Sequence, residues 1–120
     1  SQNPKLAMTL LVKNEVDVIE KNIIFHKSMG VDVIIVTDNN STDGTREVLE
    51  KLYVKGYIDE IIDEPLNDYQ QIEWVDRMIK IASEKYNADW VMNVDADEFW
   101  YSRCGDYKQI LSKTTKNILK

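Results

Sequence analysis

The stretch "DVIIVTDNNSTDGT", residues 32–45, holds a complete connection from a strand to a helix. Its branched aliphatic run is typical of a strand that is buried on both faces. The Asp, Asn, Ser and Gly residues that follow favour a tight turn, and Asp43 is a candidate N-cap for a helix. We expect this helix to carry Val48, Leu49 and Leu52 on one face and to stop at Gly56. The stretch therefore predicts one β-α unit.

The same succession of apolar runs and helical patterns extends along most of the chain. Strands that alternate with helices indicate right-handed crossovers and a parallel sheet with helices on both faces. We therefore expect an α/β fold with three layers, α/β/α, around an open and mainly parallel sheet. The strands are expected at residues 6–12, 32–36, 58–62 and 89–94.

Two further helices are expected between these strands, and a fourth near the end. The first carries Val16, Ile19 and Ile23 on one face and ends near Gly30, a candidate left-handed cap. The next is the longest and runs from about Leu66 to Tyr86. Its inward stripe is expected at Ile72, Val75, Ile79, Ala82 and Tyr86. A short helix could begin with Tyr107, Ile110 and Leu111.

The size and charge of the chain limit the kinds of function that it can have. The 120 residues, 43% of them hydrophobic, are enough for one domain over residues 1–120, and we find no internal boundary. The net charge of −6, without a dense block of Lys and Arg, argues against nucleic acid as a partner. The apolar runs are shorter than the roughly 20 residues that cross a bilayer. A single cysteine, Cys104, fits a reducing compartment as a spectator thiol. We expect a cytoplasmic protein, soluble or peripheral at the inner face of the membrane.

Polar motifs follow three of the four strands: "KNE" (13–15), "TDNNSTDGT" (37–45) and "DADE" (95–98). Ligands of open parallel sheets bind at the carboxyl ends of the strands, so these motifs should converge on one edge. Asp38, at a strand end, could accept a hydrogen bond from a nucleotide base or a ribose hydroxyl. The same motif does not fit a calcium loop, because it lacks the required glycine and the final glutamate. No glycine-rich dinucleotide fingerprint follows the first strand.

The acidic motif "DADE" is the strongest candidate for a metal site. In an extended chain Asp95 and Asp97 point to the same side, about 7 Å apart, while Ala96 points away. Carboxylate oxygens suit the hard cations Mg²⁺ and Mn²⁺, which keep positions open for substrate phosphates. A solvated acidic turn is the plainer alternative. A phosphatase of the haloacid dehalogenase type is a second one, although its D-x-D normally follows the first strand. Glu98 could belong to the metal shell or to an acceptor rim.

Several other side chains allow two interpretations. Lys13 could meet phosphate and Asn14 could donate to a base, or both could belong to a loop that enters a helix with Glu15 near its N-terminus. Arg77 could contact phosphate or a base, or simply face solvent. The single histidine, His26, is expected to be packed or at the surface rather than a ligand. Trp100 is the aromatic residue that we suspect of lining a sugar or acceptor pocket.

Taken together, "LLVKNE", "IIVTDNNSTDGT" and "DWVMNVDADEFW" resemble the donor-binding half of a family 2 glycosyltransferase with the GT-A fold, of the subgroup whose motif reads D-x-D-E-F. The resemblance implies that Asp38 contacts the base, usually uracil, in a pocket walled by the backbone of residues 13–15. It implies that Asp95 reaches the ribose and the metal shell, that Asp97 binds Mn²⁺ or Mg²⁺ and so bridges to the donor diphosphate, and that Arg77 supplies a basic contact.

The implied function is metal-dependent transfer of a sugar from a nucleoside-diphosphate sugar, with a UDP-sugar as the expected donor and a glycan or lipid-linked molecule as the acceptor. Inverting members of that family carry the acceptor-activating base well beyond the D-x-D motif. We therefore expect this chain to be part of a longer enzyme with its base beyond Lys120. A nucleotide-binding module without turnover is one alternative. A nucleotidyltransferase is the other, although "LLVKNE" lacks the glycine-rich basic loop which that class would show.

Overall fold

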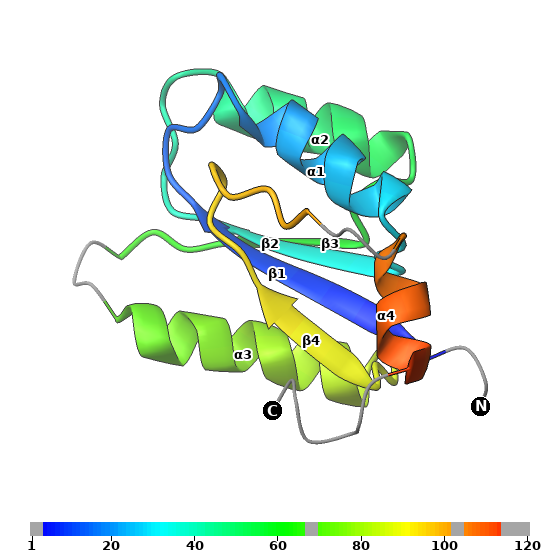
Figure 1. The fold of residues 1–120 in the computed structure, drawn as a ribbon. Coiled ribbons are helices and arrows are strands. Elements are labelled where there is room, and N and C mark those ends of the chain that lie inside the picture. Colours follow the sequence, from blue (N-terminus) through cyan, green and yellow to red (C-terminus); the bar gives the residue numbers. More distant parts are fainter. Residues whose placement is uncertain (1–3, 67–69, 102–104, 114–120) are drawn as a thin grey trace.

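The computed structural model describes residues 4–66, 70–101 and 105–113. Four strands and four helices follow one another in strict alternation, and the strands form one sheet in the order β3-β2-β1-β4 (Figure 1). The bounds are β1 Leu6–Val12, α1 Ile19–Ser28, β2 Val33–Asp38, α2 Thr45–Val54, β3 Glu60–Asp63, α3 Gln71–Glu84, β4 Trp90–Asn93 and α4 Tyr107–Lys113. The predicted α/β architecture is confirmed.

All three strand pairings are parallel, as the alternation with helices predicts. β1 is central, with Met8 paired to Ile34 of β2 on one side and to Met92 of β4 on the other. β2 extends to Asp38, two residues further than the sequence pattern suggested, because Thr37 and Asp38 still pair with the ends of β1 and β3. The carboxyl ends of the strands therefore lie at one edge of the sheet.

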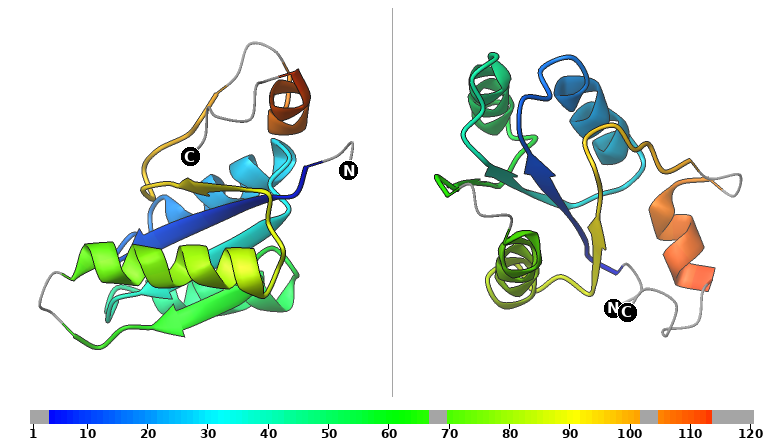
Figure 2. Two further views of the ribbon diagram at one scale, coloured as in Figure 1. Left: turned by 90° about the horizontal axis from the view of Figure 1, so that it is seen from below. Right: turned by 90° about the vertical axis from the view of Figure 1, so that its left-hand side faces the viewer.

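Helices cover both faces of the sheet, and a separate apolar core fills each side. α1 and α2 lie over one face and α3 over the other (Figures 1 and 2). Successive residues of a strand point to opposite faces, so β1 and β2 must supply apolar side chains to both cores. The core under α1 and α2 takes Leu10, Val12, Ile34 and Val36, among others. The core over α3 takes Ala7, Val33, Ile35, Met78 and Ala82.

α2 begins two residues later than the expected cap. Gly44 occupies the N-cap position with a φ of 100°, a conformation that strongly favours glycine. Asp43 still serves the helix start, because its Oδ1 accepts hydrogen bonds from the backbone N–H (3.0 Å) and the hydroxyl (2.5 Å) of Thr45. The N-cap is therefore displaced by one position from the expected Asp43.

The predicted start of α3 is wrong, and its predicted inward stripe is correct only in part. The helix begins at Gln71, and the chain at Leu66 is not helical. Trp74, Met78 and Ala82, spaced four apart, form the buried face. Ile72 is 76% exposed and Ile79 is 38% exposed. Of the predicted stripe, Ala82 is fully buried, and Val75 and Tyr86 pack against the same core. Helical spacing therefore indicated the buried side of α3 but not its centre, which lies at Trp74 and Met78.

The C-terminal part of the chain packs against the end of α1. Gly30 has a φ of 108° directly after that helix, which confirms the predicted left-handed cap. The backbone N–H of Tyr107, the first residue of α4, donates to the carbonyl of Met29 (2.7 Å). The predicted fourth helix is thus confirmed, with Tyr107 and Leu111 buried. Cys104 lies outside the described residues.

Within the part of the chain that the structure describes, no helix is both long and apolar enough to cross a membrane.

The corrected face of α3 can be tested by two substitutions on the same helix. Met78→Ala should lower the free energy of unfolding by about 2–4 kcal/mol, because it removes a fully buried side chain and leaves a cavity. Ile72→Ala should change it by less than about 0.5 kcal/mol, because the side chain is mostly in solvent. Urea denaturation measures both values. Equal losses, or a larger loss for Ile72→Ala, would show that α3 is rotated from the orientation described.

Candidate functional site

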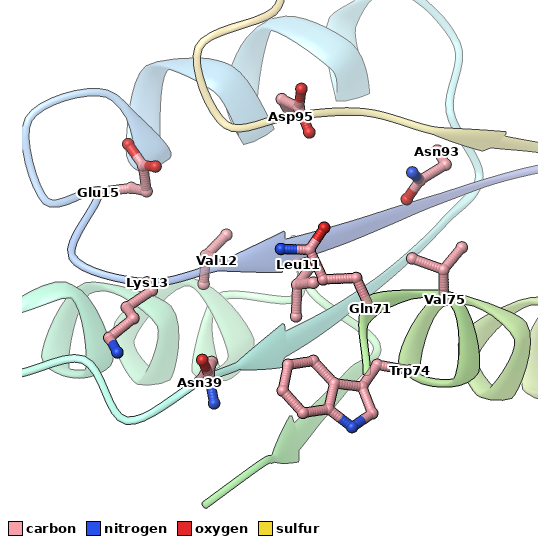
Figure 3. A pocket seen from close by; sticks show the side chains of 10 residues that line it. All are labelled: Leu11, Val12, Lys13, Glu15, Asn39, Gln71, Trp74, Val75, Asn93 and Asp95. Carbon is pink, nitrogen blue, oxygen red and sulfur yellow. The ribbon is translucent and has the colours of Figure 1, made fainter. Parts of the chain in front are cut away.

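A cavity of about 330 Å³ lies at the carboxyl edge of the sheet, between the ends of β1 and β4 and the start of α3 (Figure 3). Strand ends and the loops after them supply its polar residues, and α3 supplies an aromatic and apolar wall. It is lined by Leu11, Val12, Lys13, Glu15, Asn39, Gln71, Trp74, Val75, Asn93 and Asp95. The three polar motifs of the sequence each contribute at least one residue, so the predicted convergence on one edge is what the structure shows.

Strand alternation decides which residues reach this cavity. Ala7, Leu11, Val33, Ile35 and Val91 pack on the α3 side of the sheet, whereas their even-numbered neighbours pack under α1 and α2. The alternation continues past the strand ends, and the polar residues that line the cavity at the strand ends all have odd numbers. The cavity is therefore a continuation of the α3 face of the sheet.

The acidic motif keeps this alternation after β4. Asp95 and Asp97 are exposed, while Ala96 is 3% exposed and belongs to the core under α1 and α2. Ala96 is turned away as expected, but Ala96 and Asp97 form a turn, so the shared direction of the two carboxylates stays a prediction. Asp95 lines the cavity. Glu98 instead closes the turn: its Oε1 accepts from the backbone N–H of Asp95 (2.8 Å), and its own N–H donates to the Asp95 carbonyl (2.9 Å).

The loop after β1 is tied to the loop after β2. The backbone N–H of Asn14 donates to Ser41 Oγ (2.9 Å), and Asn14 Oδ1 accepts from the backbone N–H of Thr42 (2.7 Å). The N–H of Glu15 donates to Thr45 Oγ1 (2.8 Å). Lys13 and Glu15 line the cavity and Asn14 does not. The Asn14 side chain thus takes part in the turn through its Oδ1, and the expected donation of its amide to a base stays a prediction.

Asp38 does not line this cavity but a neighbouring hollow, with Arg46 and Asp63, and its expected base contact stays a prediction. It has an even number and lies on the side of α2, with 5% exposure. Its Oδ1 accepts from the backbone N–H of Ser41 (3.2 Å), and its Oδ2 lies 3.6 Å from Arg46 Nη1. Asn39 takes the corresponding place in the cavity. A pattern of alternation extended from β2 would have found it.

Arg77 is likewise turned to a neighbouring segment. Its Nη2 donates to Glu64 Oε1 at 2.9 Å, and Glu64 is 5% exposed. The carbonyl oxygens of Glu64 and Leu66 in turn accept from Asn39 Nδ2 (2.8 and 2.7 Å). Arg77 therefore holds the chain after β3, which supports Asn39, and it is outside the cavity lining.

The remaining candidates lie elsewhere. His26 is fully buried in α1, so the expectation of a packed histidine is confirmed. Trp100 lines an apolar hollow beside α4, with Met92, Tyr101 and Tyr107, and not the cavity at the sheet edge.

A family model for glycosyltransferase family 92 matches residues 9–118. The chain belongs to glycosyltransferase family 92. The sequence resemblance was to family 2, so the prediction of a glycosyltransferase is confirmed and the family shown is 92. No curated protein sequence matches the chain.

Two solved structures share the fold of this family 92 chain. The mannosyltransferase PcManGT from Pyrobaculum calidifontis, in complex with GDP-Man and Mn²⁺, superposes with a TM-score of 0.68 at 19% identity over 84% of this chain and 30% of its own. TarS from S. aureus gives a TM-score of 0.58 at 17% identity, over 78% of this chain and 16% of its own. The chain thus has a fold of the GT-A type and spans less than a third of either neighbour.

Several carboxylates lie close to one another at the cavity of the family 92 chain. The pKa of Glu15 is raised above its ordinary value of 4.5, chiefly by burial and then by the carboxylates of Asp97, Asp43 and Asp95. Among the described residues, no group of three or more His, Cys, Asp or Glu side chains could hold a metal ion unaided.

Four cavity residues were not predicted from the sequence: Asn39, Gln71, Trp74 and Asn93. Asn39 and Asn93 share the odd-number pattern, so a signal for them was present. Gln71 and Trp74 depend on where α3 begins and how it is rotated, and the sequence pattern left both unresolved.

Glu15 makes the stability of the metal-free protein depend on pH. The folded state holds the Glu15 proton more tightly than the unfolded chain, because its pKa is raised on folding. Its contribution to stability therefore falls as pH rises from about 4.5 through the raised pKa. Glu15→Gln should be more stable than the parent above this window and equal to it below. Thermal unfolding in EDTA across the window measures the difference. A difference independent of pH would contradict this assignment of charge, and Glu84→Gln, exposed at the far end of α3, is the control.

Proposed function

We propose that this chain binds the donor and the metal ion of a glycosyltransferase that moves a sugar from a nucleoside-diphosphate sugar to an acceptor. The observation that carries the proposal is the meeting of Lys13, Asn39 and Asp95, from three different strand ends, in one cavity at the carboxyl edge of the sheet. Membership of family 92 and the fold shared with a GDP-Man complex support it.

The cavity offers each part of a nucleoside diphosphate a suitable surface. Trp74 and Val75 present an apolar wall against which a base can pack. Asn39 and Gln71 carry amide groups that can pair with the polar edge of a base or with a ribose hydroxyl. Lys13 supplies a cation that favours a phosphate. On the sequence resemblance we propose a UDP-sugar as the donor, and the GDP-Man bound by PcManGT makes guanine the alternative to be tested.

Asp95 and Asp97 would hold Mn²⁺ or Mg²⁺. When bound, such an ion would offset the negative charge that develops on the departing diphosphate. The Asp95 and Asp97 carboxylates, together with Glu15, would otherwise repel the diphosphate, so donor binding should require the cation. Lys13 contributes positive charge to the same cavity.

The acceptor is proposed to be a glycan or a lipid-linked molecule. The base that activates it is proposed to lie beyond Lys120, because this chain corresponds to only 30% and 16% of the two structural neighbours.

A screen of nucleoside diphosphates with and without Mn²⁺ tests the proposal. UDP, GDP, CDP and dTDP should each be compared by thermal shift, and one should stabilise the protein only when Mn²⁺ is present. A ligand at about 100 times its Kd adds about 2.7 kcal/mol to the free energy of unfolding. Asp97→Asn and Asp95→Asn should abolish the effect, while Glu84→Gln should retain it. Indifference to every nucleotide with Mn²⁺ would refute the proposal. Mn²⁺-dependent release of the nucleoside diphosphate from its sugar would distinguish an enzyme from a binding module.

Two further variants test which side of β2 faces the donor. Asp38→Asn should change nucleotide affinity by less than about twofold, because Asn keeps an acceptor for the Ser41 N–H and Arg46 keeps Asp63 and Glu50 as partners. Lys13→Ala should weaken affinity by roughly 3- to 10-fold, about 1 kcal/mol, because a phosphate would lose a facing cation. Calorimetry with Mn²⁺ measures both, with Lys51→Ala on α2 as the control.

A loss of tenfold or more in Asp38→Asn would restore Asp38 as the direct base contact, since a hydrogen bond to a charged group contributes about 1.5–3 kcal/mol.

A further inference from the structure

Two buried polar side chains of α1 stand behind the acidic loop. Asn22 and His26 are four residues apart, so they share one face of the helix, and both are fully buried. Neither lines the cavity at the sheet edge. Buried polar groups are costly unless they are hydrogen-bonded, so the partners of these two side chains show what they do.

The side-chain amide of Asn22 donates to backbone carbonyls of the acidic loop, residues 95–98. Asn22 Nδ2 lies 2.8 Å from the carbonyl oxygens of Ala96 and Glu98 and 3.2 Å from that of Asp95. These carbonyls belong to the residues on both sides of Asp97. One buried amide group therefore holds the loop at both flanks of the position that carries the second carboxylate.

His26 determines the orientation of that amide. Its Nε2 lies 3.4 Å from the backbone N–H of Trp100, which can only donate, so Nε2 is the acceptor and the proton is on Nδ1. Nδ1 then donates to Asn22, 2.9 Å from its carbonyl oxygen and 3.1 Å from its Oδ1. With Oδ1 turned to His26, the Nδ2 group of Asn22 faces the loop. Burial also lowers the pKa of His26, which favours this neutral form.

We propose that Asn22 and His26 are positioning residues that hold the loop 95–98 so that Asp95 and Asp97 present their carboxylates to one divalent cation. The proposal rests on the proposed function for the identity of the bound ion. It does not rest on it for the loop itself, because the hydrogen bonds from Asn22 go to backbone carbonyls of the loop and not to the carboxylates of Asp95 and Asp97.

Two substitutions of His26 test the roles of its two ring nitrogens separately. His26→Asn keeps a donor near the place of Nδ1 and so can still orient Asn22. His26→Gln places its polar atoms near Nε2 and has only carbon near Nδ1. Asn22→Leu keeps a similar volume and removes all three contacts to the loop. Leu52→Ala, fully buried in the same core but remote from the loop, is the control for general loss of stability.

Two measurements on each variant decide the proposal. The first is hydrogen–deuterium exchange over residues 94–99 in the metal-free protein. The second is the affinity for Mn²⁺ in the presence of UDP and, in parallel, GDP, from the paramagnetic resonance signal of free Mn²⁺. His26→Gln and Asn22→Leu should speed exchange in the loop and weaken Mn²⁺ binding by about 10- to 100-fold, the usual effect of losing an outer partner of a metal site. His26→Asn and Leu52→Ala should leave both within about threefold of the parent.

These measurements distinguish failure of the positioning role of Asn22 and His26 from failure of the proposed function. If the parent binds no Mn²⁺ with either nucleotide, the metal site fails, and the exchange data still show whether Asn22 and His26 hold the loop. Faster exchange with unchanged Mn²⁺ affinity would overturn the positioning role. Equal effects of His26→Asn and His26→Gln, or the same effects in Leu52→Ala, would overturn it as well.

Discussion

The alternation of side chains along strands that are buried on both faces is the constraint on which this molecule depends. β1 and β2 lie between two layers of helices, so each successive residue must suit a different core. The same alternation continues just beyond the last paired positions, as far as Lys13, Asn39 and Ala96. It sends Lys13, Asn39 and Asp95 toward α3, and it sends Asp38 and Ala96 toward the opposite layer. The chemistry at the sheet edge is thus an extension of the packing within it.

Asparagine side chains hold the strand-end loops in register with one another. Asn14 joins the loop after β1 to the loop after β2, Asn39 joins the end of β2 to the chain after β3, and Asn22 joins α1 to the loop after β4. In each case an amide pairs with backbone groups that the turns leave without partners in the sheet. Each such bond contributes about 1 kcal/mol net, and a buried partner left unpaired costs more. The loops are therefore shaped before any ligand arrives.

The carboxylates that lie close together at the cavity lower the stability of the protein when no ligand is bound. Glu15, Asp43, Asp95 and Asp97 lie close enough for their charges to raise the pKa of Glu15. Keeping like charges close together costs the empty protein some stability, because each carboxylate disfavours the ionised form of its neighbours. By contrast, Asp38 and Glu64 are buried carboxylates that face arginines, Arg46 and Arg77 respectively. Those two pairs are structural, which explains why neither arginine is turned to the cavity.

The sequence by itself determined the alternation of strands and helices along the chain, the parallel sheet and the convergence of the three polar motifs on one edge of it. These features follow from local patterns: period-two alternation, helical spacing, turn residues and the left-handed cap at Gly30. Only the tertiary structure decided which face of α3 is buried, that Asn39 and not Asp38 lines the cavity, and that Arg77 pairs with Glu64. The reason is physical, because each of these depends on which of two equally patterned faces meets a neighbour far away in the sequence. The same is true of Asn22 and His26, whose partners lie more than seventy residues away.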